Sequence, residues 1–135
     1  MKIKKNCLIE TYKNVIVCEE NKRKILFFNK NNKKVIKIII DNCQIENGLR
    51  CDFLVIFNNL QNFIELKGND ISHAFKQLER TINLLGKNQY LKKAFVISSR
   101  SPLSSPELQN KKLFFKRKLK TMLIVKNKFI KINIE

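Results

Sequence analysis

The fold of this chain is decided by residues 51–70, which read CDFLVIFNNLQNFIELKGND. Residues 51–57 are almost continuously apolar after Asp52, which is typical of a strand that is covered on both faces. The asparagines that follow indicate a turn, and residues 62–67 form a second expected strand. This stretch therefore predicts a buried antiparallel hairpin.

An amphipathic helix is expected directly after the hairpin. Gly68 ends the second strand, and Asn69 or Asp70 can cap a helix. Apolar residues then recur at positions 71, 74, 75, 78, 82 and 85, which is the spacing of one helical face, and the pattern ends at Gly86.

The rest of the chain adds further strands and a second helix. We expect strands at residues 12–18, 24–28, 33–40 and 93–98, an Asn-rich turn at 29–32, a helix at 107–119, and a last hairpin from 122–125 and 129–134. Strands around two helices predict an α/β or α+β fold. With 135 residues and 16.0 kDa, the chain has the size of a single domain, residues 1–135.

No stretch of the sequence has the pattern of a membrane span or a secretion signal. The longest apolar runs, such as residues 38–40, fall far short of the roughly 18 residues that a span needs. The N-terminal residues lead into no apolar segment of the kind that a signal peptide carries. We therefore expect a soluble, cytoplasmic protein with no membrane partner.

Net charge is the most prominent feature of the composition. The chain carries 28 Lys and Arg against 11 Asp and Glu, a formal charge of +17, which suits a polyanionic partner such as DNA or RNA. Lys outnumbers Arg 23 to 5, and Lys, Asn and Ile, which all have A+T-rich codons, are the abundant residues. Codon usage thus explains part of the basicity, and charge alone favours a nucleic-acid partner only weakly.

Acidic residues are scarce, so those inside apolar strands are informative. Asp52, one of three aspartates, opens the first strand of the hairpin. Glu65 and Lys67 lie two residues apart in the second strand and therefore point to the same face. A turn centred on residues 59–60 would place Asp52 opposite Lys67 and Glu65 opposite Leu54, so that two carboxylates and an ammonium group meet at one end of the hairpin.

Such a cluster has the chemistry of a magnesium-dependent phosphodiesterase. Mg²⁺ typically binds one or two protein carboxylates and leaves its other positions to water and phosphate. A metal held by Asp52 and Glu65 can polarise a phosphodiester, and Lys67 can position the attacking hydroxide. The alternative is a salt bridge between Lys67 and one of the carboxylates. A second Glu-x-Lys sequence, residues 20–22, lies in a polar stretch, and we interpret it as surface.

This arrangement resembles the PD-(D/E)XK nuclease superfamily, to which restriction endonucleases and Holliday-junction resolvases belong. The resemblance rests on CDFLVI at residues 51–56, FIELKG at 63–68, the helix at 70–85 and the strand at 94–98. It implies a restriction-endonuclease-like αβββαβ core, a mixed central sheet flanked by helices, with Asp52 and Glu65 as metal ligands and Lys67 as the catalytic lysine.

Two features of the sequence depart from the family pattern. Cys51 stands in place of the proline that gives the motif its name. Family members often supply another acidic residue from an N-terminal helix, and this sequence predicts no such helix. Glu10, Glu19 and Glu46 are the candidates for that acid.

The resemblance implies a Mg²⁺-dependent or Mn²⁺-dependent DNA endonuclease. The small size of the chain suggests that specificity would come from a homodimer, a protein partner or the structure of the nucleic acid. One alternative is a non-catalytic nucleic-acid-binding module or accessory subunit of a processing or defence assembly. Another is a basic RNA-associated protein in which the three residues form only a salt bridge.

Two further segments carry candidate binding residues. Gln77 lies on the polar side of the expected helix and either supports the site or is an ordinary solvated side chain; His73 receives no catalytic role. The segment at 111–118 alternates cations with aromatics, so that Lys111, Lys112, Lys116 and Arg117 are candidates for phosphate contact while Leu113, Phe114 and Leu119 are candidates for the core.

The chain has four cysteines, Cys7, Cys18, Cys43 and Cys51. None of them has the close spacing of a typical zinc site, so we expect reduced, mostly buried thiols. A zinc ion that joins the first two to the last two is the alternative.

Overall fold

The computed structural model describes residues 1–67, 70–99 and 104–135, and of Lys67 it describes only the backbone. The strands are β1 (Leu8–Thr11), β2 (Val15–Glu20), β3 (Arg23–Phe28), β4 (Val35–Ile39), β5 (Phe53–Phe57), β6 (Leu60–Lys67), β7 (Leu91–Ser98), β8 (Thr121–Asn127) and β9 (Phe129–Asn133). The helices are α1 (Ile71–Leu85) and α2 (Ser105–Leu119), and a short 3₁₀ helix covers Lys5–Cys7.

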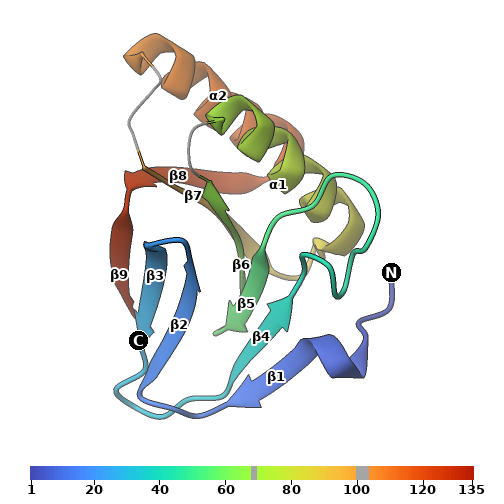
Figure 1. Cartoon of the computed structure of the whole chain (residues 1–135), viewed down its shortest axis with the longest axis vertical. Helices are drawn as coiled ribbons and strands as arrows, with labels where there is room; N and C mark the ends of the chain where they lie inside the picture. The colour runs from blue at the N-terminus through green and yellow to red at the C-terminus, as the bar shows by residue number, and fades with distance from the viewer. Residues whose placement is uncertain (68–69, 100–103) are drawn as a thin grey trace.

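The strands form one large and one small sheet, so the chain has an α+β fold with a mixed sheet and two helices (Figure 1). The large sheet has the order β1-β4-β5-β6-β7-β8, antiparallel from β1 to β6 and parallel from β6 to β8. The small sheet has the order β2-β3-β9, in which β2 and β3 form a hairpin and β9 runs parallel to β3.

The large sheet lies between the two helices and the small sheet. Helix α1 packs its buried face, which includes Leu78 and Ile82, against one side of the large sheet, together with Phe115 of α2. Ile25 and Phe27 of the small sheet pack against the other side. Strand β6 lies at the centre and is buried on both faces, which agrees with its apolar sequence.

Helix α1 and the central hairpin confirm the expectations from the sequence. Asp70 caps α1, because its carboxylate accepts a hydrogen bond from the His73 N–H at 3.0 Å. Gly86 follows the last helical residue. The turn between β5 and β6 is formed by Asn58 and Asn59, whose φ angles of 50° and 59° suit the type I′ turn of a two-residue hairpin.

The last two strands do not form the expected hairpin. Strand β8 pairs with β7 in the large sheet, whereas β9 pairs with β3 in the small sheet. Lys128, with a φ of 59°, is the single residue between β8 and β9. One residue is too short for a hairpin turn, so the chain instead bends from one sheet into the other.

The N-terminal part of the chain also differs from expectation. The strand expected at residues 12–18 is found as β2 but lies at Val15–Glu20, and β1, which belongs to the other sheet, was not expected. Apart from the 3₁₀ turn at Lys5–Cys7, residues 1–40 contain no helix, so the described chain lacks the helix that opens an αβββαβ order.

Two of the four cysteines form a disulfide, which corrects the expectation of reduced thiols. Cys7 and Cys43 are bridged with a Cα–Cα distance of 5.7 Å, and their use in this bridge removes them from the zinc alternative. Cys18 and Cys51 are free and buried. Burial raises the pKa of the Cys18 thiol to about 12 and also raises that of Cys51, so both thiols are protonated near neutral pH.

Candidate functional site

Asp52 and Glu65 lie near the same end of the β5–β6 hairpin. The strands pair from Phe57↔Leu60 to Phe53↔Ile64, so the turn lies one residue earlier than expected and the expected pairing of Asp52 with Lys67 is wrong. Asp52 and Phe53 both lie opposite Ile64, because the Asp52 N–H donates to the Ile64 carbonyl, and the regular register therefore ends before Glu65. Glu65 follows Phe63 on the helix side of the sheet, whereas Asp52 adjoins Glu20 of the small sheet, which packs on the other side.

Both carboxylates are buried, at 8% exposure for Asp52 and 2% for Glu65. The Asp52 N–H donates to the Ile64 carbonyl at 3.0 Å, and the Leu66 N–H donates to Asp52 Oδ2 at 2.8 Å. The Asp52 side chain thus takes the place of a backbone acceptor at the end of the hairpin. Buried carboxylates are costly in proteins, so two near one end of the same hairpin indicate a special site.

A third carboxylate, that of Glu20, adjoins Asp52. Burial raises the pKa of Asp52 from an ordinary 3.8 to about 6, and Glu20 adds to this rise both as a negative charge and as a hydrogen-bond partner. The charge of Asp41 acts in the same direction, while the Leu66 N–H opposes it. A carboxyl group with a pKa near 6 next to a second acid is the situation that a bound cation would relieve.

Glu20 is exposed, as its Glu-x-Lys sequence was interpreted, but its place beside Asp52 was not expected. A signal for it exists in the alternation of β2, in which Ile16 and Cys18 face the large sheet and Glu20 is the next residue of that series. The three acids suggested by the sequence lie elsewhere: Glu10 pairs with Lys34, Glu46 pairs with Lys4, and Glu19 faces away from Asp52 along β2.

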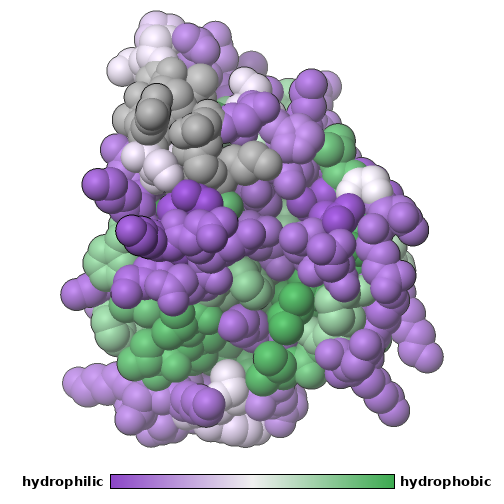
Figure 2. All heavy atoms as spheres, in the orientation of Figure 1, coloured by the Kyte–Doolittle hydropathy of each residue, from purple (hydrophilic) through white to green (hydrophobic). Residues whose placement is uncertain are grey.

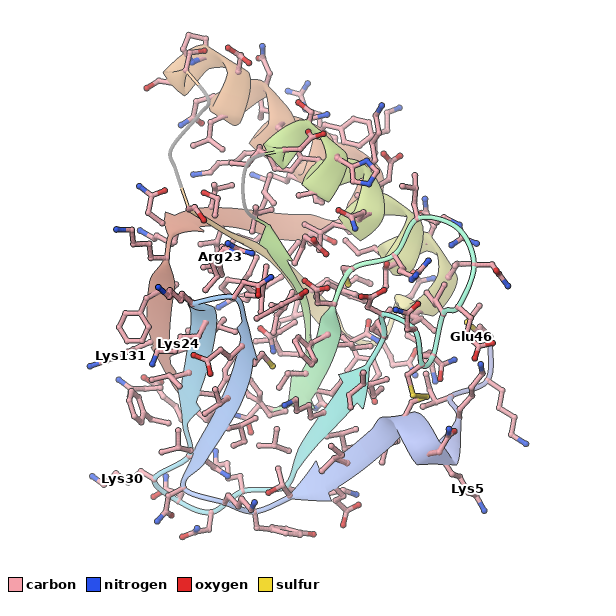
Figure 3. The ribbon with its side chains drawn as sticks, viewed as in Figure 1. Lys5, Arg23, Lys24, Lys30, Glu46 and Lys131 are labelled. Carbon is pink, nitrogen blue, oxygen red and sulfur yellow. A yellow bond between two sulfur atoms is a disulfide. The ribbon has the colours of Figure 1, made fainter. Side chains whose placement is uncertain are left out.

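Arg23 directly follows the β2–β3 turn and reaches the same end of the large sheet through Ser99. It pairs with Glu20 in the hairpin register, and its Nη1 donates to Ser99 Oγ at 2.9 Å (Figure 3). Its Nε is buried and has no hydrogen-bond partner within the described ranges.

The expected catalytic lysine is placed only by its backbone. Lys67 is the last residue of β6 and pairs with Ser98 of β7, at the end of the sheet where Arg23 contacts Ser99. Its side chain lies outside the described part of the chain, as do residues 68–69.

Gln77 supports the segment that leads into Asp52. Its Nε2 donates to the Arg50 carbonyl at 2.9 Å. One turn later, the buried Thr81 hydroxyl accepts from the Cys51 N–H at 2.9 Å and donates to the Gln77 carbonyl at 2.8 Å. Helix α1 therefore holds the two residues before Asp52 by their backbone, which fixes where the Asp52 side chain begins.

The basic residues of α2 are not gathered around the carboxylates. Lys111 lies over the rings of Phe75 and Phe114 at 5.5 and 5.2 Å from their centroids. Lys112 and Lys116 line a groove against β8, and Arg117 is exposed. Of the candidate core residues in this segment, Leu119 is buried and Phe114 packs against the core, whereas Leu113 is exposed.

The donor set fits a divalent cation through a carboxylate pair. Among the described residues, no group of three or more His, Cys, Asp or Glu side chains is arranged to hold a metal ion. Mg²⁺ needs only one or two protein carboxylates, and the adjacency of Glu20 to Asp52 supplies such a pair, with Glu65 on the neighbouring strand.

Comparison with protein-family models, with curated proteins and with solved structures gives no match for this chain. In the described part of the chain, neither helix is long and apolar enough to cross a lipid bilayer.

Proposed function

We propose that this chain is a divalent-metal-dependent nuclease of the PD-(D/E)XK kind, which hydrolyses phosphodiester bonds in DNA. The observation that carries the proposal is the buried Asp52 beside Glu20, with the buried Glu65 near the same end of the central hairpin, in a chain with a net charge of +17. The order of β4, β5, β6, α1 and β7 supports it, because it matches the part of the αβββαβ order that follows the first helix.

In this proposal each residue has a separate role. Asp52 and Glu65 hold Mg²⁺ or Mn²⁺, with Glu20 as a further acid beside Asp52. The bound ion supplies Lewis-acid polarisation of the phosphodiester and lowers the pKa of water. Lys67 orients the attacking water. Gln77 and Thr81 position Asp52 through the backbone of residues 50–51.

The proposal is tested by nicking of supercoiled plasmid and cutting of a branched duplex in the presence of Mg²⁺ or Mn²⁺. We expect metal-dependent cleavage by the wild type and its loss in Asp52→Ala, Glu65→Gln and Lys67→Ala. Glu10→Gln is the matched control, because this exposed glutamate pairs with Lys34 on the β1–β4 side of the sheet and should leave cleavage unchanged. Cleavage that survives in all three site variants would refute the assignment.

The alternative is a non-catalytic nucleic-acid-binding module. The observation that favours it is that Asp52 is already engaged within the fold, by the Leu66 N–H and by Glu20. This alternative predicts that the wild type and Asp52→Asn bind DNA equally, are both inert with metal, and show no Mg²⁺ binding by calorimetry.

A further inference from the structure

The small sheet presents an outer face on which aromatic rings alternate with lysines. Strand β3 turns Ile25 and Phe27 toward the core, so Lys24, Leu26 and Phe28 face outward. Strand β9 turns Ile130 and Ile132 inward, so Phe129, Lys131 and Asn133 face outward. In Figure 3, Lys24 and Lys131 extend from the outer side of β3 and β9, away from the large sheet.

The cations and rings of this face are in direct contact. Lys24 pairs with Phe129 in the parallel β3–β9 register, and its Nζ lies 5.6 Å from the ring centroid. Lys131 Nζ lies 5.5 Å from the Phe129 centroid and 6.0 Å from that of Phe28. Phe129 remains 39% exposed, which is high for an aromatic side chain in a sheet. The four residues Lys24, Phe28, Phe129 and Lys131 are called the platform below.

Apolar side chains extend the platform toward β2. Val15 and Val17 are each 40% exposed on the outer face of that strand. Figure 2 shows apolar side chains gathered over β2 and β3, below an upper region that is mostly hydrophilic. A flat, partly apolar face with exposed rings and lysines combines surfaces for stacking with charges for phosphates.

The platform leads to the carboxylates. Lys24 directly follows Arg23, which contacts Ser99, and Arg23 pairs across the turn with Glu20, the neighbour of Asp52. Figure 1 places the β2–β3 turn beside the end of β7, at the edge of the sheet that bears the candidate site. A strand that crosses the platform toward this turn would therefore arrive at the carboxylates.

We propose that the platform binds a single-stranded segment of nucleic acid and guides it to the carboxylate site, with bases stacked on Phe129 and Phe28 and phosphates on Lys24 and Lys131. Single strands are favoured over duplexes because duplex bases are stacked on one another and offer no free face to a ring, whereas unpaired bases do. Each lysine would exchange its contact with the ring for a phosphate oxygen. This inference rests on the proposed function, because that proposal supplies nucleic acid as the class of ligand.

The test measures binding without cleavage, so that it is independent of catalysis. Fluorescence anisotropy with a labelled oligodeoxythymidine and with a blunt duplex would be recorded in EDTA. We expect Phe129→Leu to weaken single-strand binding about tenfold and to leave duplex binding unchanged, because leucine keeps the apolar contact but cannot stack. Lys131→Gln should lower the slope of log K against log salt for the single strand by roughly 0.7. Glu19→Gln should tighten binding, since Glu19 pairs with Lys24.

Two matched controls decide between this surface and others. Phe114→Leu changes a ring that also has a lysine over it, Lys111 at 5.2 Å, but on α2. Lys5→Gln removes an exposed lysine on the other side of the molecule (Figure 3). Both should bind like the wild type.

The inference is overturned if Phe129→Leu binds the single strand as tightly as the wild type, or if Phe114→Leu weakens binding instead. A circular dichroism melt of each variant separates lost binding from lost folding. If the wild type never cleaves DNA yet Phe129→Leu loses single-strand binding, the nuclease proposal fails and the platform stands.

Discussion

Replacing Asp52 by asparagine should stabilise the metal-free protein at neutral pH. Burial, together with the neighbouring carboxylates of Glu20 and Asp41, raises the pKa of Asp52 from 3.8 to about 6. Native protein therefore keeps a proton on Asp52 at pH values where the unfolded chain has released it. The contribution of Asp52 to the free energy of unfolding is greatest below the pKa of the unfolded chain. It falls as the pH rises from 3.8 toward about 6 and is constant above this window.

The size of the effect follows from the pKa difference. A shift of about 2 units at about 1.4 kcal/mol per unit corresponds to on the order of 3 kcal/mol, which is an upper limit for the gain in the variant. The asparagine amide is uncharged at every pH, and its oxygen can still accept the hydrogen bond from the Leu66 N–H. The variant should thus match the wild type near pH 4 and exceed it near pH 8.

The assay is urea denaturation followed by circular dichroism in EDTA, at several pH values between about 4 and 8. The informative quantity is the difference in the free energy of unfolding between variant and wild type, because titrating groups that do not interact with Asp52 cancel in it. Asp70→Asn is the matched control, because it removes an exposed carboxylate and keeps a side chain that caps α1. A difference for Asp52→Asn that stays constant across this range would refute the reasoning.

Three further changes have expected effects on stability. The double variant Cys7→Ser/Cys43→Ser should lose about 4 kcal/mol, because the disulfide spans a separation of 36 residues; equal urea midpoints for oxidised and dithiothreitol-reduced wild type would contradict this. Thr81→Val should cost about 1–3 kcal/mol, because it leaves the Cys51 N–H buried without its acceptor, while Thr81→Ser keeps the hydroxyl and should cost less in a thermal melt. Asn59→Gly should raise the free energy of unfolding by about 0.5 kcal/mol, because glycine adopts the left-handed φ of 59° without strain; a lower melting temperature than wild type would argue against this turn.

Local features of the sequence predicted the elements that position the site. The apolar run of β5, the asparagine turn and the capped helix α1 are each specified by neighbouring residues, and all three are confirmed. The predicted register was wrong by two positions because the turn was centred on Asn59 and Leu60 instead of Asn58 and Asn59. A type I′ turn needs left-handed φ angles at both central residues, which asparagine tolerates and leucine avoids.

Long-range pairings could not be predicted in the same way. The disulfide depends on the pairing of β1 with β4, which brings Cys7 beside the loop that contains Cys43. The position of Glu20 beside Asp52 depends on the packing of the small sheet against the large one. The alternation of β2 shows that Glu20 shares a face with Ile16 and Cys18, but nothing along the chain shows that this face meets Asp52. The disulfide and the pairing of β9 with β3 leave no signal in the residues near them along the chain.

The parallel pairing of β3 with β9 also affects the order in which the parts of the fold form. Strand β3 ends at Phe28, whereas its second neighbour β9 begins at Phe129 and is therefore made much later in synthesis. Closing so long a loop costs chain entropy before any contact compensates for it, so this pairing belongs to the slow steps of folding. The β2–β3 hairpin, which carries Glu20 and Arg23, therefore acquires its final support only after the large sheet can already have formed. A nascent chain would hold the central hairpin with Asp52 and Glu65 before it holds the finished site.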